Sequence, residues 1–347
     1  MSENFDSALT YNSYLGIDEL LKLQKPISDG PEHDEMLFII IHQAYEVWFK
    51  QIIYEIDSCT KLLSGDTIKD NSPDLQTIVH RTNRITTILK VLVHQIDIME
   101  TMTPMDFLDF RDLLRPASGF QSWQFKTIEA KLGLKFEHRH GQNYYTSQLK
   151  PQQVAMIKDV ESKPSVIQLL NNWLERMPFF DNSELWKNYS ALYTNNTDKH
   201  HFWNDYITIY AEGLGEGEKQ NLAAFEKYFF SEENDPERQL STKAARSALF
   251  IMLYRGYPLL QYPYQLLNNL LEIDEQLSIW RFRHINMVSR IIGMRTGTGG
   301  STGKEYLMGA LSKHYIFKEI SAMTSFLIEN RRKPKLSKEL QEKLGFI

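Results

Sequence analysis

The sequence has little cysteine, no long apolar run, and no charged or apolar leader at its start. The one cysteine, Cys59, excludes a disulfide within the chain and a thiolate metal cluster, and it fits a reducing cytoplasm. The longest apolar runs, such as residues 37–41, are far too short to span a bilayer. The first residues, MSENFDSALTYNSYLG, contain neither the basic nor the apolar region of a signal peptide. We therefore expect a cytoplasmic protein that does not enter a membrane.

The sequence also lacks a strong excess of either charge. The formal net charge of -5 argues against nucleic-acid binding, which usually requires a basic surface. Hydrophobic residues make up 42% and charged residues 24%, which is ordinary for a globular protein. With 347 residues, the chain can bury a sizeable core as one large domain or two smaller ones.

Alternation of apolar and polar residues, the pattern of half-buried strands, is nearly absent, and glycine and proline are sparse outside a few clusters. Apolar residues instead recur at spacings of three and four, which predicts helices. We expect an all-α bundle, with residues 1–30 as an N-terminal arm and residues 31–347 as a single domain. Within that domain, residues from about 146 to 235 have weaker apolar stripes and predict an inserted helical subdomain, with a helix at 151–161. The stretches with the strongest helical periodicity are 35–63, 72–99, 122–132, 241–271, 275–292 and 303–329.

Two histidines, His42 and His284, lie far apart in the sequence, each on the apolar stripe of a helical segment. Such a histidine destabilises the fold unless its ring nitrogens find partners. Each could be a core residue that bonds a neighbour, or the two could face each other across a bound cofactor. The apolar residues that share their helical faces are Phe38, Tyr45 and Phe49 for His42, and Trp280, Met287, Val288 and Ile291 for His284.

Arg111 is predicted on an aromatic helix face with Phe107 and Phe110. Thr103 and Pro104 form a typical helix start, with threonine as the N-cap and proline in the first turn. An arginine on such a face can bind a planar anion, because its fork of donors matches a carboxylate. The alternative is a salt bridge to one of the nearby acidic residues, which are Asp106, Asp109 and Asp112.

A loop with four glycines occupies residues 294–307, with the sequence MRTGTGGSTGKEYL. It does not match a phosphate-binding P-loop, because Glu305 stands where serine or threonine is needed and the preceding segment is helical. Closely spaced glycines allow a backbone to approach a ligand closely. We expect this loop to fold over a small ligand, with the Thr298 and Ser301 hydroxyls as donors, or else to be a flexible connection.

Other catalytic motifs are missing. Glu137 and His140 make a single Glu-x-x-His pair, whereas a di-iron bundle needs two such pairs and two further carboxylates. No HExxH, CxxCH or GxSxG sequence occurs, which disfavours a zinc protease, a c-type haem and a serine hydrolase.

Five segments in this order closely resemble the tryptophan 2,3-dioxygenase family. The resemblance covers roughly residues 9–145 and 240–330, whereas the middle of the chain is less distinctive. It implies an all-α haem protein and a haem-dependent dioxygenase that cleaves the indole C2–C3 bond of L-tryptophan with O2. The product would be N-formyl-L-kynurenine, in the first step of the kynurenine pathway. The segments are LTYNSYLGIDELL, HDEMLFIIIHQAYEVWFKQ, FRDLLRPASGFQSWQF, WRFRHINMVSRIIG and GTGGSTG.

The resemblance also implies where haem b would bind, one per subunit and with ferrous iron in the active form. His284 corresponds to the axial iron ligand, with a second group expected to fix its other ring nitrogen. Ser118 would lie near the haem edge, and Trp280 would line the cofactor site one turn before His284.

The residues expected to bind the substrate follow from the same resemblance. His42 would accept a hydrogen bond from the indole N–H and assist proton movement, so it is the expected catalytic residue. Phe38 and Phe107 would pack around the indole; Phe107 corresponds to tyrosine in some family members. Arg111 would hold the carboxylate, and Thr298 would contact the ammonium and carboxylate groups.

The family resemblance further implies a homotetramer in which the N-terminal arm reaches a neighbouring subunit. Tyr11 and Tyr14 would then contribute to that neighbour's substrate pocket. Two functions are alternatives to the dioxygenase: a related haem-dependent hydroxylase of a modified tryptophan, and a haem sensor without turnover. An amino-acid clamp favours an enzyme, because a sensor does not need one.

Overall fold

The chain is described by a computed structural model that covers residues 9–65, 69, 71–139, 142–177, 179–193, 198–233, 235, 238–293, 295, 308–309, 311 and 313–345. These residues form helices and connecting segments without any strand, which confirms the all-α prediction. In order, the elements are α1 (Tyr11–Leu15), α2 (Ile17–Leu20), α3 (His33–Leu63), α4 (Pro73–Met99), α5 (Pro104–Arg111), η2 (Asp112–Leu114), η3 (Gly119–Gln121), α6 (Trp123–Leu132), η4 (Phe136–His138), α7 (Gln142–Ser147), α8 (Pro151–Glu161), α9 (Val166–Glu175), η5 (Ser183–Trp186), α10 (His201–Gly213), η6 (Glu216–Glu218), α11 (Gln220–Phe230), α12 (Thr242–Tyr254), α13 (Pro258–Ile292), α15 (Lys318–Ala322), η7 (Met323–Phe326), η8 (Asn330–Arg332) and α16 (Lys338–Leu344).

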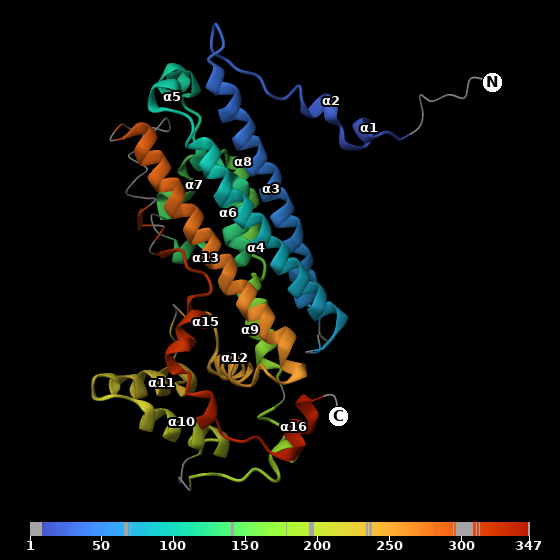
Figure 1. Cartoon of the computed structure of the whole chain (residues 1–347), viewed down its shortest axis with the longest axis vertical. Coiled ribbons are helices and arrows are strands. Elements are labelled where there is room, and N and C mark those ends of the chain that lie inside the picture. Colours follow the sequence, from blue (N-terminus) through green and yellow to red (C-terminus); the bar gives the residue numbers. More distant parts are fainter. Residues whose placement is uncertain are drawn as a thin grey trace, which may run out of the picture.

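The long helices α3, α4 and α13 run side by side and form the body of an elongated molecule (Figure 1). Helix α4 packs against both α13 and α3, and α3 also packs against α6. Buried apolar side chains from all four helices belong to one core, which extends into the other half of the molecule. The short helix α5 lies across one end of this bundle, where α3 begins and α13 ends.

Side-chain caps set the beginnings of several helices. The Ser72 hydroxyl accepts a hydrogen bond from the Leu75 amide at the start of α4. Thr103 is the N-cap of α5 with Pro104 in the first turn, as predicted, and it also forms a capping box with Asp106. These caps bond backbone N–H groups that have no partner within the helix, so they define where each helix starts.

The helices in the region 241–292 differ from the prediction, which placed a boundary between residues 271 and 275. The structure has α12, a break near Gly256, and then one helix of 35 residues, α13. Pro258 occupies the first turn of α13, where its missing N–H costs nothing. Nothing in residues 271–275 stops a helix, so α13 continues as far as Gly293.

The predicted helix at 303–329 is not one continuous helix where the structure describes it. Described residues there are helical at 308–309, 311 and 313 and again in the short helices α15 and η7, and residues 314–317 between them are not helical. The Asp274 carboxylate on α13 accepts hydrogen bonds from the backbone amides of Ile316 (3.1 Å) and Phe317 (2.6 Å). Because these amides bond a side chain of another helix, they do not take part in a continuous helix.

The middle of the chain supplies helices α8 to α11. Helix α8 has the predicted bounds and packs on α6, while α9 packs on α3 and α12. Helices α10, α11 and α12 form the other end of the molecule with α15 and α16 (Figure 1). Aromatic rings dominate the core there; those of Phe202, Phe225, Phe229 and Phe250 are fully buried.

The N-terminal arm projects away from the bundle (Figure 1). Neither α1 nor α2 contains a buried residue. The arm is attached near its end, where the Glu35 carboxylate accepts hydrogen bonds from the backbone amides of Ile27 (2.7 Å) and Ser28 (3.1 Å). None of the described helices combines the length and apolar composition that a membrane span requires.

Candidate active site

A second, smaller hydrophobic cluster lies where α3, α4, α5 and α13 meet, at the end of the bundle. Its buried members are Ile41, Met99, Met102 and Phe110, and half-buried apolar side chains surround them. The half-buried members come from four elements and include two residues expected at the substrate site; they are Leu37, Phe38, Tyr45, Phe107, Leu114 and Met287.

His42 is held in one tautomer by its own helix. Its Nδ1 atom lies 2.7 Å from the carbonyl oxygen of Phe38, one turn earlier on α3. A carbonyl can only accept, so Nδ1 carries the proton and Nε2 is left as an acceptor. Desolvation lowers the pKa of His42 below 6.5, although the bond to Phe38 and the charge of Glu46 oppose this shift. His42 is therefore neutral at pH 7.

The side chain of His42 is surrounded by protein atoms but keeps an exposed surface. This combination is typical of a residue that lines a hollow rather than one packed in a core. The ring lies 4.1 Å from the Phe38 ring, centroid to centroid. Of the two interpretations open for His42 in the sequence, its exposure disfavours a filled core position.

His284 on α13 is also a neutral imidazole. Burial, with a smaller contribution from nearby His42, lowers the pKa of His284 to about 4. Its ring stacks on that of Trp280 at a centroid distance of 5.1 Å and an interplanar angle of 7°. Within the described part of the chain, its buried Nδ1 atom has no hydrogen-bond partner, so the expected second group is not seen there. A neutral imidazole in apolar surroundings has the donor atom that haem iron binds.

Three phenylalanine rings form an aromatic wall beside His42. The Phe38 ring lies 5.7 Å from both the Phe107 and Phe110 rings, and the last two are 5.4 Å apart at 89°. Phe110 is fully buried, whereas Phe38 and Phe107 are half-buried and keep some open surface. The wall therefore presents two ring surfaces on which a planar apolar group can pack.

Arg111 is the last residue of α5 and is only 5% exposed. Of the three acidic residues that the sequence suggests as alternative salt-bridge partners of Arg111, two bond other groups. Asp106 accepts from the Thr103 amide at 2.9 Å, and Asp112 pairs with Arg115 at 3.2 Å. A buried guanidinium one turn from Phe107 is therefore placed to bind an anion next to the aromatic wall.

Comparison with known proteins identifies the family. The sequence profile of tryptophan 2,3-dioxygenase matches residues 2–327. The chain is 39% identical to tryptophan 2,3-dioxygenase from Bdellovibrio bacteriovorus over 97% of its length and 98% of the relative's. It is 40% identical to the enzyme of that name from Dictyostelium discoideum, over 99% and 90% of the two chains. For the Anopheles gambiae enzyme the identity is 38%, over 98% and 91%.

The chain belongs to the tryptophan 2,3-dioxygenase family. This result confirms the resemblance that was read from five sequence segments. It also makes the alternative of a di-iron carboxylate bundle unnecessary; among the described residues, no group of three or more metal-binding side chains comes together. Of the Glu137–His140 pair, His140 lies outside the described residues.

Of the other site residues that the family implies, the structure describes Ser118, Tyr11 and Tyr14. Ser118 caps the short helix η3, its hydroxyl accepting a hydrogen bond from the Phe120 amide at 3.3 Å. Thr298 and the rest of the glycine loop from residue 296 to 307 lie outside the described residues. Tyr11 and Tyr14 are 79% and 73% exposed on α1, in the arm that projects away from the bundle (Figure 1).

Sequence reasoning missed a set of buried charges next to the site. Glu129 on α6 bonds Arg139 and Arg281, and all three side chains are at most 5% exposed. Phe125, one turn before Glu129, packs on Trp280 at a centroid distance of 4.9 Å. The available signal was the charge of Arg281, three residues before His284 in a segment whose other charge nearby is Arg283, but nothing local indicated its partner.

Proposed function

We propose that this protein is a haem-dependent dioxygenase that converts L-tryptophan and O2 to N-formyl-L-kynurenine. The observation that carries the proposal is the neutral histidine pair, His42 and His284, beside an aromatic wall in a chain of the tryptophan 2,3-dioxygenase family. When bound, haem b with ferrous iron supplies the oxygen chemistry, and the protein supplies binding, orientation and polarity.

His284 is the residue that would hold the haem iron. One neutral imidazole suits haem, which brings four nitrogen ligands of its own and needs a single axial donor from the protein. The buried, unbonded Nδ1 of His284 and its pKa of about 4 support this assignment among the described residues, because both keep the ring uncharged. Trp280 supports the ring by stacking, and Ser118 would lie at the haem edge.

His42 orients the indole. With Nδ1 donating to the Phe38 carbonyl, Nε2 is free to accept the indole N–H. A neutral acceptor with a lowered pKa holds the indole proton without removing it, and it can take the proton when the ring loses electron density. Phe38 and Phe107 pack on the ring faces, which limits its orientation. The absence of a hydroxyl at Phe107 leaves this packing unchanged.

Arg111 binds the carboxylate of the amino acid. Because the guanidinium is buried, it would form a strong, hydrogen-bonded ion pair with the substrate carboxylate, which free indole lacks. Thr298 would contact the ammonium and carboxylate groups from the glycine loop. These roles favour unmodified L-tryptophan as the substrate.

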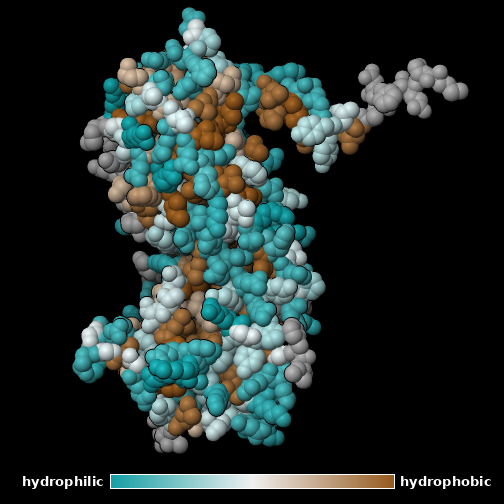
Figure 2. Space-filling model, viewed as in Figure 1, coloured by the Kyte–Doolittle hydropathy of each residue, from teal (hydrophilic) through white to brown (hydrophobic). Residues whose placement is uncertain are grey.

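The N-terminal arm is the segment that would join neighbouring subunits. Its apolar side chains are exposed, as Figure 2 shows, and a homotetramer would cover them. Tyr11 and Tyr14 would then enter the pocket of a neighbouring subunit. We place the enzyme in the cytoplasm, consistent with a single buried cysteine, Cys59.

The decisive experiment measures product formation. Ferrous, fully haem-loaded protein is mixed with L-tryptophan and O2, and the absorbance of N-formylkynurenine is followed. We expect turnover without a consumed reductant. No product from L-tryptophan would exclude the dioxygenase; hydroxylated product from a modified tryptophan would indicate the related hydroxylase, and haem binding without either product would indicate a sensor.

A further inference from the structure

The buried charges beside the site form a three-way junction centred on Glu129. One carboxylate oxygen lies 2.6 Å from Nη1 of Arg139, and the other lies 2.6 Å from Nη2 of Arg281. His314 approaches the same carboxylate at 3.6 Å. Although burial alone would raise the pKa of Glu129, Arg139 and Arg281 hold it well below its usual value. The carboxylate is therefore charged and joins three separate segments of the chain.

Arg281 connects this junction to the helix that carries His284. It lies three residues before His284 on α13 and next to Trp280, on which the His284 ring stacks. Its other nitrogen, Nη1, donates to the backbone carbonyl of His314 at 3.2 Å. One guanidinium thus bonds α6 and the segment that leads into α15 at the same time.

Near Arg281, helix α6 makes two contacts with α13. Glu129 bonds Arg281, and Phe125, one turn earlier on α6, packs on Trp280. The two contacts lie one turn apart on α6 and at neighbouring residues of α13, so together they restrict rotation and sliding of α13 relative to α6. An ion pair with bonds of 2.6 Å restricts them more sharply than apolar contacts, which tolerate small shifts; setting register is the best-attested use of buried polar groups.

The orientation of the His284 imidazole depends on how firmly α13 is held in place. Ligating histidines usually donate their second ring N–H to a fixed acceptor, which orients the ring. Among the described residues, Nδ1 of His284 has no such acceptor. The orientation of the ring then follows from the Trp280 stack and from the placement of α13 itself.

We propose that Glu129 is a positioning residue for the haem iron: through Arg281 it fixes the rotation of α13 and hence the direction of the His284 imidazole. Glu129 touches neither substrate nor haem in this role. The inference rests on the proposed function only in that His284 is taken as the iron ligand.

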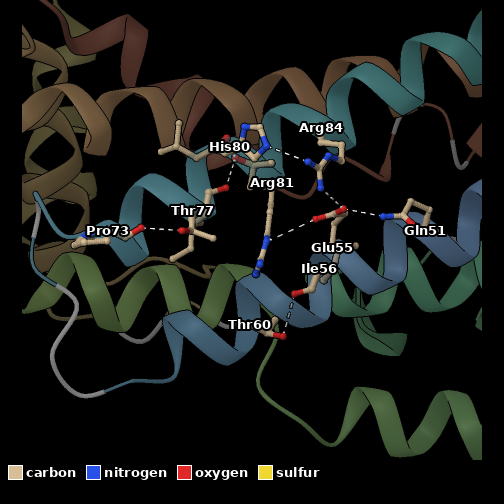
Figure 3. A network of polar contacts seen from close by, with 12 residues as sticks. Gln51, Glu55, Ile56, Thr60, Pro73, Thr77, His80, Arg81 and Arg84 are labelled. Atoms are coloured by element: carbon tan, nitrogen blue, oxygen red, sulfur yellow. Dashed lines mark hydrogen bonds and ion pairs between the residues drawn. The ribbon is translucent and has the colours of Figure 1, made fainter.

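The test compares two buried carboxylates of the same bundle. Figure 3 shows the second, Glu55 on α3, which accepts hydrogen bonds from Gln51 (2.7 Å) and Arg84 (2.8 Å) and lies 3.8 Å from Arg81. Glu55 is 2% exposed and Glu129 is 4% exposed, and each pairs with two arginines. Glu55→Gln is therefore a control that removes the charge of a buried carboxylate paired with partly exposed arginines of α4, without disturbing the contact of α6 with α13.

The measurement is the iron–histidine stretching frequency in the resonance Raman spectrum of the ferrous protein, together with haem affinity. We expect Glu129→Gln to shift the frequency and to weaken haem binding about 10-fold or more, the effect of disturbing the surroundings of a metal ligand. Glu55→Gln should leave both unchanged even where it lowers the melting temperature. Unchanged values in folded Glu129→Gln, or equal changes in both variants, would overturn the proposal.

Arg281→Lys decides the question if Glu129→Gln does not fold. Lysine keeps the charge but loses the fork that bonds Glu129 and the His314 carbonyl together, so the frequency should shift in the same direction. An unshifted frequency in Arg281→Lys would refute the inference. His284→Ala separates this outcome from failure of the proposed function. If His284→Ala keeps the wild-type haem spectrum, His284 is not the ligand. If His284→Ala loses haem but the iron–histidine frequency of Arg281→Lys is unshifted, only the positioning role is rejected.

Discussion

Replacement of Arg111 by leucine tests how the enzyme would recognise its substrate. The Arg111 side chain is almost completely buried beside the aromatic wall, so water screens its charge poorly and its attraction for a bound carboxylate is strong. Loss of one member of a buried, hydrogen-bonded charge pair costs about 2–5 kcal/mol. At about 1.4 kcal/mol per factor of ten, kcat/KM for L-tryptophan should fall roughly 30- to 5,000-fold in Arg111→Leu.

Arg115→Leu is the matched control for this change. Arg115 is half-exposed and pairs with exposed Asp112 at 3.2 Å, an interaction worth less than about 1 kcal/mol. Its loss should alter kcat/KM by less than about fivefold, because it lies outside the buried wall.

The assay follows N-formylkynurenine formation from L-tryptophan, and consumption of O2 with tryptamine, which lacks the carboxylate. The wild-type protein should prefer L-tryptophan by about the same factor that Arg111→Leu loses, and the variant should treat both compounds alike. If Arg111→Leu still prefers L-tryptophan by the wild-type factor, the carboxylate binds elsewhere and the reasoning is refuted.

Three further predictions concern other parts of the molecule. His284→Ala should lose haem, seen as loss of the Soret band, whereas a normal band would contradict the axial assignment. Because desolvation lowers the pKa of His42 below 6.5, protonation of Nε2 should reduce kcat/KM at acid pH with a midpoint below pH 6.5. His42→Ala should lack this decline, and a midpoint above pH 6.5 would contradict a lowered pKa. Glu35→Gln removes a charged acceptor from the amides of Ile27 and Ser28, which costs about 1.5–3 kcal/mol of the attachment of the arm. Limited proteolysis should therefore cleave residues 9–30 faster in this variant. An unchanged cleavage rate would mean that Glu35 does not anchor the arm.

The candidate site was predictable where its signals are local. His42 and Phe38 are one turn apart, and the same is true of Trp280 and His284, so periodicity alone put each pair on one helix face. The Thr103 cap of α5 depends on residues three positions apart and was found for the same reason. The family resemblance added the identity of the reaction, which periodicity does not contain.

Other features depended on contacts between distant segments. The helix predicted at 303–329 is interrupted at residues 314–317, where Asp274, some forty residues away, bonds the amides of Ile316 and Phe317. Glu129 and Arg281 are 152 residues apart, and no spacing rule connects them.

The sequence by itself determined the helical class of the fold, the capped start of α5 at Thr103, the apolar faces that carry His42 and His284, and the family. These follow from interactions between residues three or four positions apart, and from motifs in a fixed order. Only the tertiary structure decided which charges are buried, which partners they bond, and how α13 is held against α6. Those choices depend on the packing of helices that are distant in sequence, and burial is what makes an ion pair such as Glu129–Arg281 consequential for the neighbouring histidine.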